Sequence, residues 1–160
     1  MTTKQPKVFS NPVHFLAFGF GSGLSPKAPG TTGTVVAVLI HLALAPYLTL
    51  HSYLAFLVVS FLAGIYLCGN TARDLGEHDC GGIVWDEFVG YWVAMFMVPT
   101  TWYWVATAFI LFRLFDILKP FPIGLLDKKV HGGLGIMLDD LLAGIYALLL
   151  LQAAILFTGF

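Results

Sequence analysis

Charged side chains are scarce in this sequence. They make up 11% of the 160 residues, whereas 58% are hydrophobic. With a mean hydropathy of +0.85, the chain is too apolar for an ordinary soluble domain and is typical of a membrane protein. Eight basic and nine acidic residues leave a net charge of -1, and no basic run is present. The sequence therefore argues against a nucleic-acid partner.

Cysteine is equally scarce, and a secretory leader is not evident. Cys68 lies in an apolar stretch and Cys80 in a polar one, with no paired spacing, so we expect neither a zinc site nor a disulfide framework. The N-terminal apolar stretch is short and is broken by Asn11, Pro12 and glycines. We therefore do not expect a cleaved signal peptide.

The spacing of the charges predicts where the chain crosses the membrane. All charged residues fall in three blocks, at residues 4–27, 73–87 and 113–140. A helix needs about 20 residues to span a bilayer. Residues 28–72 hold two apolar runs around a polar break at 46–52, which predicts a helical hairpin. Residues 136–157 predict one further crossing.

The uncharged residues 88–112 allow two interpretations. Their length suits one tilted crossing, but Pro99 and two threonines interrupt them, and the apolar pattern extends outward to Ile83 and Leu118. We therefore predict a second hairpin, with arms of roughly 24 Å whose charged ends lie at the membrane interface.

The predicted fold is an all-α, polytopic transmembrane bundle with about five crossings and two hairpins. It forms a single domain over residues 1–160, with an N-terminal interfacial segment at 1–32 and the bundle at 33–158. A short helix is expected within 11–20, capped by Asn11. All lysines and arginines then lie on one side, which the positive-inside rule assigns to the cytoplasm.

Acidic residues gather at the same ends of three predicted crossings. Carboxylates this close to hydrocarbon are costly unless they are paired or bound to a cation, so they indicate a functional site. Arg113 lies three residues before Asp116 on one helix face and offers a structural ion pair as the alternative explanation. One arginine cannot neutralise all five carboxylates, whereas a divalent cation would. The five are Asp86, Glu87, Asp116, Asp139 and Asp140.

The composition of this acidic set favours a hard metal ion. It offers only oxygen ligands, which suit Mg²⁺ or Mn²⁺ better than zinc. The histidines contribute little: His41 and His51 are expected on the far side or in lipid, and His78 and His131 in loops. Only His131 is placed where it could hydrogen-bond near the site.

A glycine-rich segment at residues 19–34, GFGSGLSPKAPGTTGT, precedes the first crossing. Its backbone N–H groups, the following helix N-terminus and its polar side chains suit a phosphate. The Walker pattern is absent. The alternative is a plain helix-entry turn capped by threonine. The candidate phosphate ligands are Lys27, Gly30, Thr31, Thr32 and Thr34.

Two glycines lie one helical turn beyond the acids: Gly90 follows Asp86 by four residues, and Gly144 follows Asp140 by four. Close helix approach at these glycines would bring the acidic ends together. The alternative is that glycine is simply common in membrane helices. Four nearby aromatic residues are expected to be lipid-facing or interfacial anchors: Trp92, Trp102, Tyr103 and Trp104.

Four sequence blocks stand out along residues 19–144: GSGLSPKAPGTTGT, IVWDEFVG, FRLFDILKPFPI and GGLGIMLDDLLAG. Together they resemble the phosphatidylglycerophosphatase A family of bacterial membrane lipid phosphatases. The resemblance implies Mg²⁺-dependent hydrolysis of phosphatidylglycerophosphate to phosphatidylglycerol and phosphate at the cytoplasmic face of the inner membrane. It also implies a set of functional positions. These are the five acidic residues together with Lys27, Thr31, Thr32, Arg113 and Lys119.

We expect Asp86, Glu87 and Asp140 to hold one or two Mg²⁺ ions, with Asp116 or Asp139 as a general base or a further ligand. Asp116 is the candidate fourth metal ligand. Arg113 and Lys119 would offset charge on the phosphate. The nucleophile is either water or a carboxylate. Two rival functions remain. A CDP-alcohol phosphotransferase would need an Asp-rich helical motif, and only residues 71–74 faintly resemble it. A cation-coupled transporter would need ionisable groups along its path, but the membrane-embedded stretches lack charged residues.

Overall fold

The computed structural model describes residues 8–76 and 80–159, apart from the side chain of Lys128, and these residues form an all-helical fold. This confirms the predicted fold class. In chain order the elements are α1 (Pro12–Ala17), η1 (Gly19–Leu24), α2 (Pro29–Leu44), η2 (Ala45–Tyr47), α3 (Leu50–Leu75), α4 (Trp85–Ala94), α5 (Trp102–Leu118), α6 (Ile123–Lys129) and α7 (Gly132–Thr158).

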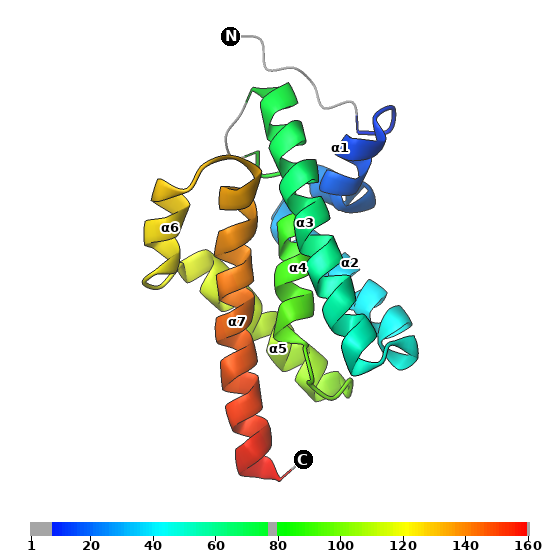
Figure 1. Ribbon diagram of the computed structural model, residues 1–160, viewed down its shortest axis with the longest axis vertical. Helices are drawn as coiled ribbons and strands as arrows, with labels where there is room; N and C mark the ends of the chain where they lie inside the picture. Colours follow the sequence, from blue (N-terminus) through cyan, green and yellow to red (C-terminus); the bar gives the residue numbers. More distant parts are fainter. Residues whose placement is uncertain (1–7, 77–79, 160) are drawn as a thin grey trace.

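The short helix α4 forms the centre of the bundle, with α2, α3, α5 and α7 packed against it (Figure 1). All of its residues from Phe88 to Ala94 are buried. A helix that is apolar on every face is expected to be enclosed by its neighbours. The outer helices therefore screen α4 from the surroundings and position its first turn.

Within the described residues, three helical segments are long and apolar enough to cross a membrane: Pro29–Tyr47, Leu50–Leu75 and Gly132–Thr158. The expected number of five crossings is not confirmed. Helix α4 has ten residues and is about 15 Å long, roughly half of a hydrocarbon core. Helix α5 has 17 residues, or about 26 Å. Apolarity along residues 83–98 thus reflects burial inside the protein more than a full span.

Both predicted chain reversals are present. Helix α2 ends at η2, which contains Pro46, and α3 starts after Thr49, whose side chain caps it by accepting a hydrogen bond from the Ser52 N–H. Helices α4 and α5 run in opposite directions, and the non-helical stretch between them contains Pro99 (Figure 1). These turns and the C-terminus lie toward one end of the bundle, whereas the starts of α4 and α7 face the other.

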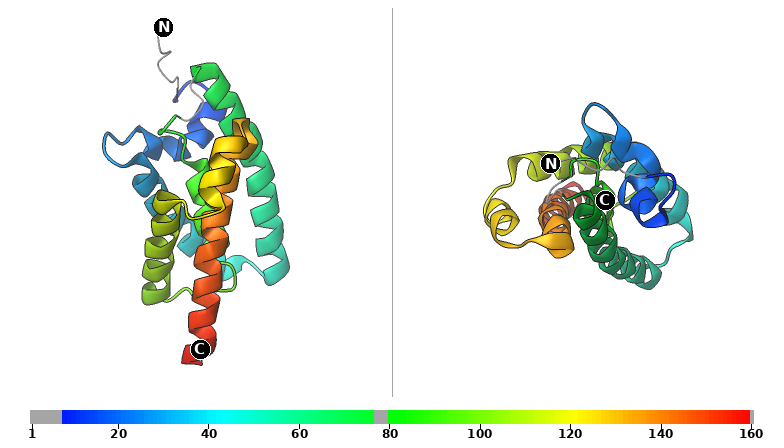
Figure 2. Two further views of the ribbon diagram at one scale, coloured as in Figure 1. Left: turned by 90° about the vertical axis from the view of Figure 1, so that its left-hand side faces the viewer. Right: turned by 90° about the horizontal axis from the view of Figure 1, so that it is seen from above.

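The expected short N-terminal helix is present, and Asn11 caps it as predicted. The Asn11 side chain accepts a hydrogen bond from the Val13 N–H at 2.9 Å, and Pro12 is the first residue of α1. The helix ends at Ala17, short of residue 20. Helices α1 and α6 lie on opposite sides of the bundle (Figure 2). The glycine-rich segment is split between η1 and the first turns of α2, which begins at Pro29.

Two side chains that the sequence interpretation allowed to face lipid lie in the interior. Trp92 is only 2% exposed, and its indole N–H donates to the Ala37 carbonyl at 3.0 Å, so it is not a lipid-facing anchor. His41 lies in the last turn of α2 and is buried, with its Nδ1 3.2 Å from the Tyr53 hydroxyl, so of the two expected places lipid is wrong. An apolar sequence does not distinguish a protein interior from lipid. Of the other expected anchors, Trp102 is exposed and Trp104 is buried.

Candidate functional site

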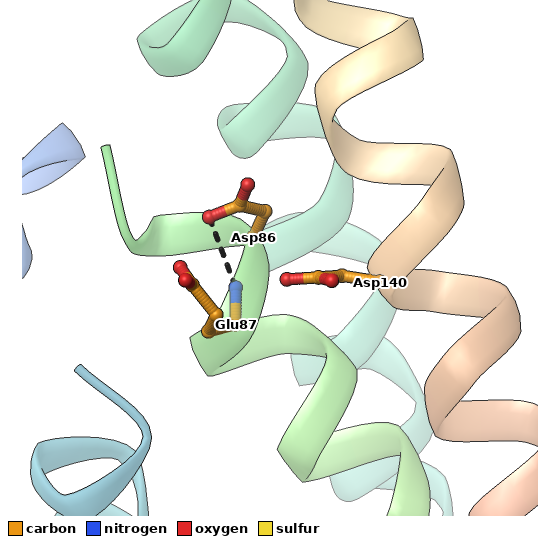
Figure 3. Close-up of side chains that lie close together, drawn as sticks. All are labelled: Asp86, Glu87 and Asp140. Atoms are coloured by element: carbon orange, nitrogen blue, oxygen red, sulfur yellow. Dashed lines mark hydrogen bonds between the residues drawn. The ribbon is translucent and has the colours of Figure 1, made fainter. Parts of the chain in front are cut away.

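Three carboxylates from two helices meet beside the N-terminus of α4. Asp86 and Glu87 lie in its first turn, and Asp140 projects toward them from α7 (Figure 3). One oxygen from each residue lies within 4.8 Å of the other two. The Glu87 N–H also donates to the Asp86 side chain at 3.0 Å. The predicted convergence of the two acidic ends is therefore present in the structure.

Two cations each contact a pair of carboxylates around this cluster. Arg113 Nη1 lies 2.6 Å from Asp116 Oδ2 and 3.7 Å from Glu87 Oε1. The Lys119 ammonium lies 2.7 Å from Asp139 Oδ2 and also contacts the carboxylate of Asp127 in α6. The Arg113–Asp116 ion pair weighed as an alternative explanation thus exists. It does not neutralise the whole cluster, because Arg113 is shared with Glu87.

Negative charge remains uncompensated at the centre. Among the ion pairs of the described residues, none joins a cation to Asp86 or Asp140. Buried Glu87 Oε2 and Asp139 Oδ1 have no hydrogen-bond partner within the described part of the chain. Buried charges of this kind are costly unless a counter-ion is present.

The residues present fit a hard divalent cation. Asp86, Glu87 and Asp140 offer only carboxylate oxygens, the ligand type that Mg²⁺ prefers. Glu87 Oε2 supplies a buried acceptor that lacks a donor. No cysteine or histidine belongs to this group of potential ligands among the described residues, which disfavours zinc.

The N-terminus of α2 lies next to the Glu87–Arg113 ion pair. A side chain at Gly30 would overlap Glu87 Oε1 and would come within 3.0 Å of Arg113 Nη1, so the backbone of α2 touches this ion pair directly. The first N–H groups of a helix lack intrahelical acceptors and attract anions. Gly30 and Thr31 are therefore placed where backbone donors could meet a phosphate next to Arg113.

The remaining predicted phosphate ligands are placed less favourably. The Thr34 side chain is fully buried, and its hydroxyl donates to the Gly30 carbonyl at 2.8 Å. Thr32 donates to the Ala28 carbonyl at 3.3 Å. Both hydroxyl protons are thus used within α2. Thr31 is half-buried, and Lys27 is exposed just before the helix.

Lys119 is the C-cap residue of α5, and its side chain contacts residues of α6 and α7. Besides Asp139, its ammonium lies 3.1 Å from Asp127 Oδ1. Although burial alone would lower the pKa of Lys119, these two carboxylates raise it above its ordinary value, so the side chain stays charged at neutral pH. The Tyr146 hydroxyl donates to the Phe121 carbonyl at 3.0 Å and fixes the turn that precedes α6.

The sequence interpretation missed the partner role of Asp127, because no spacing rule relates a residue of α6 to the end of α5 across an irregular turn. It also missed His14, whose Nε2 lies 3.2 Å from Asp74 Oδ2 and links α1 to α3. Asp74 is thus engaged away from the three-carboxylate cluster. Glu77, His78 and Asp79 lie outside the described residues.

Fold and site together define an all-helical protein whose long apolar helices enclose an acidic, oxygen-rich centre suited to phosphate chemistry. The sequence model of a family described as Phosphatidylglycerophosphatase A matches residues 15–155. The chain is 49% identical over 144 residues to a Phosphatidylglycerophosphatase A of Haemophilus influenzae, which covers 89% of this chain and 88% of the relative. It is also 49% identical over 137 residues to a protein of that name from Escherichia coli, covering 85% and 79%.

A third relative carries a different name. It is a Putative phosphatidylinositol-3-phosphatase of Bacteroides thetaiotaomicron, 44% identical over 143 residues, which covers 85% of this chain and 89% of the relative. No solved structure matches the chain significantly. The chain belongs to the phosphatidylglycerophosphatase A family, and it is accordingly a phosphatase.

Proposed function

We propose that this enzyme hydrolyses the terminal phosphomonoester of phosphatidylglycerophosphate, giving phosphatidylglycerol and inorganic phosphate in phospholipid biosynthesis. The observation that carries the proposal is the meeting of Asp86, Glu87 and Asp140 beside Arg113 and the N-terminus of α2. The names of the two relatives that are 49% identical supply the substrate.

We further propose that the reaction depends on Mg²⁺ held by Asp86, Glu87 and Asp140. When bound, the ion supplies positive charge that offsets the charge of the phosphate oxygens and helps to activate a nucleophile. The uncompensated charge of these carboxylates supports this assignment. It also accounts for a partly buried acidic cluster that costs stability without a counter-ion.

The protein groups around the three carboxylates then have distinct roles. Arg113 and the first N–H groups of α2 bind the equatorial oxygens of the phosphate, where charge must be stabilised during transfer. Asp116 or Asp139 accepts a proton from the attacking water. The oxygen of that water bonds to phosphorus as the bond to the glycerol oxygen breaks. The departing alkoxide takes up a proton from solvent, and the protonated carboxylic acid later returns its proton to solvent. Attack by a carboxylate, followed by hydrolysis of the phosphoenzyme, is the alternative route.

The proposed location is the bacterial inner membrane, with the site at its cytoplasmic face. The lysines and arginines gather at the charged ends of the helices, which the positive-inside rule places in the cytoplasm. The three long apolar segments supply the membrane anchorage. The lipid headgroup would then meet the carboxylates at the interface, without leaving the bilayer.

A second substrate deserves a direct comparison because the Bacteroides relative bears the name of an inositol-lipid phosphatase. Phosphatidylinositol 3-phosphate is also a phosphomonoester on a lipid headgroup, so the same groups would serve its hydrolysis. The two substrates differ in the bulk of the alcohol that leaves. Relative kcat/KM on the two lipids decides between them.

The test is phosphate release by the purified protein in detergent micelles. We expect release from phosphatidylglycerophosphate with Mg²⁺, none with EDTA, and slower release from phosphatidylinositol 3-phosphate. A folded protein that releases no phosphate from either lipid contradicts the proposal. Transfer of the phosphatidyl group from CDP-diacylglycerol to an alcohol, with release of CMP, would indicate the phosphotransferase alternative. Cation flux into liposomes would indicate the transporter.

A further inference from the structure

An apolar groove runs along the outside of the bundle between α2 and α5. Its volume is about 630 Å³, within the range of ligand-binding clefts. Every lining side chain except Thr100 is apolar, and most of the lining comes from these two helices. Leu39 of α2 and Ile110 of α5 are 60% and 63% exposed, so the groove opens sideways.

The lining of the groove starts one helical turn from the candidate site on both helices. On α5, Arg113 follows Ile110 by three residues and Phe109 by four, which places all three on one helix face. On α2, Val35 follows Thr31 by four, just below the point where Gly30 touches the Glu87–Arg113 pair. The candidate site therefore lies just beyond one end of the apolar groove.

The length of the groove matches one leaflet of a bilayer. From Arg113 to Trp102 at the far end, α5 extends by eleven residues, or about 16 Å. One leaflet contributes about half of a ~30 Å hydrocarbon core. A chain that starts at the phosphate-binding groups and follows α5 would thus end near the middle of the membrane.

We infer that this groove holds a fatty-acyl chain of the lipid whose phosphate is hydrolysed. The inference rests on the proposed function and adds to it the part of the enzyme that positions the tail. Lipid tails are present all around a membrane protein, so the groove contributes orientation more than affinity. Fixing the tail beside α5 aligns the headgroup with Arg113 and the carboxylates, and such alignment can strongly affect the rate.

A groove-filling substitution tests this assignment. Ala106 lines the groove, and Ala106→Trp would occupy it without touching the carboxylates. Ala55→Trp is the matched control, because Ala55 is exposed on α3 and lies outside the groove. Both variants are assayed on a dioleoyl substrate and on a dibutyroyl substrate with the same headgroup.

We expect Ala106→Trp to lower kcat/KM on the dioleoyl substrate at least tenfold and to leave the dibutyroyl rate close to that of the wild type. Ala55→Trp should change neither. Equal kcat/KM of Ala106→Trp and wild type on the dioleoyl substrate overturns the inference. So does a change of oligomeric state in Ala106→Trp, which would make the groove an interface between copies of this chain. A wild-type enzyme inactive on both substrates contradicts the proposed function instead.

Photo-crosslinking of the unmodified protein keeps the inference testable if Ala106→Trp does not fold. A substrate analogue with a diazirine in its acyl chain is irradiated in the complex, and labelled peptides are identified by mass spectrometry. Labelling concentrated on α2 and α5, and competed by unlabelled substrate, supports the assignment. Uniform labelling of α3, α5 and α7 contradicts it.

Discussion

Gly90 of α4 and Gly144 of α7 meet backbone to backbone. A Cβ atom at Gly144 would overlap the Gly90 carbonyl oxygen, and one at Gly90 would lie 2.7 Å from the Asp140 carbonyl oxygen. Each glycine lies one turn from a carboxylate of the cluster. This contact sets the distance between the helices at which Asp86 and Asp140 can share one ligand.

Replacing Gly144 with alanine should therefore lower the activity, although Gly144 is not itself one of the three carboxylate residues. The added methyl group forces α4 and α7 apart, at a cost of about 1–3 kcal/mol for overpacking. We expect a lower melting temperature in detergent and at least a tenfold loss of phosphate release, because small displacements of reacting groups are costly. Gly81→Ala is the control, since a Cβ there meets nothing within 4 Å. Wild-type activity in Gly144→Ala would show that this contact does not position the acids.

Lys119→Met should destabilise the junction of α5, α6 and α7. It leaves the largely buried Asp139 carboxylate without its ammonium partner, a change of about 1–3 kcal/mol. Because the pKa of Lys119 is raised in the folded state, its stabilisation is complete below the ordinary value of 10.5 and is lost only at higher pH. The melting-temperature difference from wild type should thus remain present from about pH 6 to about pH 9.

Lys119→Arg provides the control for charge and should recover most of the lost stability. A melting-temperature difference between Lys119→Met and wild type that disappears within that neutral range would contradict the assignment of this side chain as permanently charged.

The hydroxyl groups of α2 should differ in importance. Thr34→Val removes a hydroxyl that is buried and already bonded to the Gly30 carbonyl, so we expect phosphate release to change less than threefold. Thr31→Val alters a half-buried side chain next to Gly30 and should raise the KM for the lipid. Steady-state kinetics of the two variants checks this order. A larger effect from Thr34→Val would restore Thr34 as a phosphate ligand.

The sequence predicted the features that depend on hydrophobicity and charge alone. The long apolar helices α2, α3 and α7 and the reversal at Pro99 follow from the uncharged stretches and their polar breaks. The meeting of Asp86 with Asp140 follows from the rule that charged groups avoid lipid and gather together. Each of these inferences needs only a local pattern.

Features that depend on how the helices pack could not be predicted from hydrophobicity and charge. Apolarity does not tell whether a helix faces lipid or protein, so Trp92 was expected as a lipid-facing or interfacial anchor, and lipid was one of two places expected for His41, although both side chains are buried. Lys119 contacts Asp127 because an irregular turn brings α6 back beside α5, and no periodic pattern encodes this. The expected five crossings are not confirmed for the same reason, since α4 is apolar but enclosed.

The most direct test of the account is the Mg²⁺ dependence of phosphate release by Asp140→Asn. This substitution keeps the size of the side chain but removes the one cluster charge supplied by α7, and Asp74→Asn is the matched control outside the cluster. We predict that Asp140→Asn loses at least 99% of the activity and needs more Mg²⁺ for what remains, whereas Asp74→Asn behaves like the wild type. A folded Asp140→Asn enzyme with wild-type rate and wild-type Mg²⁺ dependence would contradict the claim that carboxylates from α4 and α7 form a single metal-dependent site.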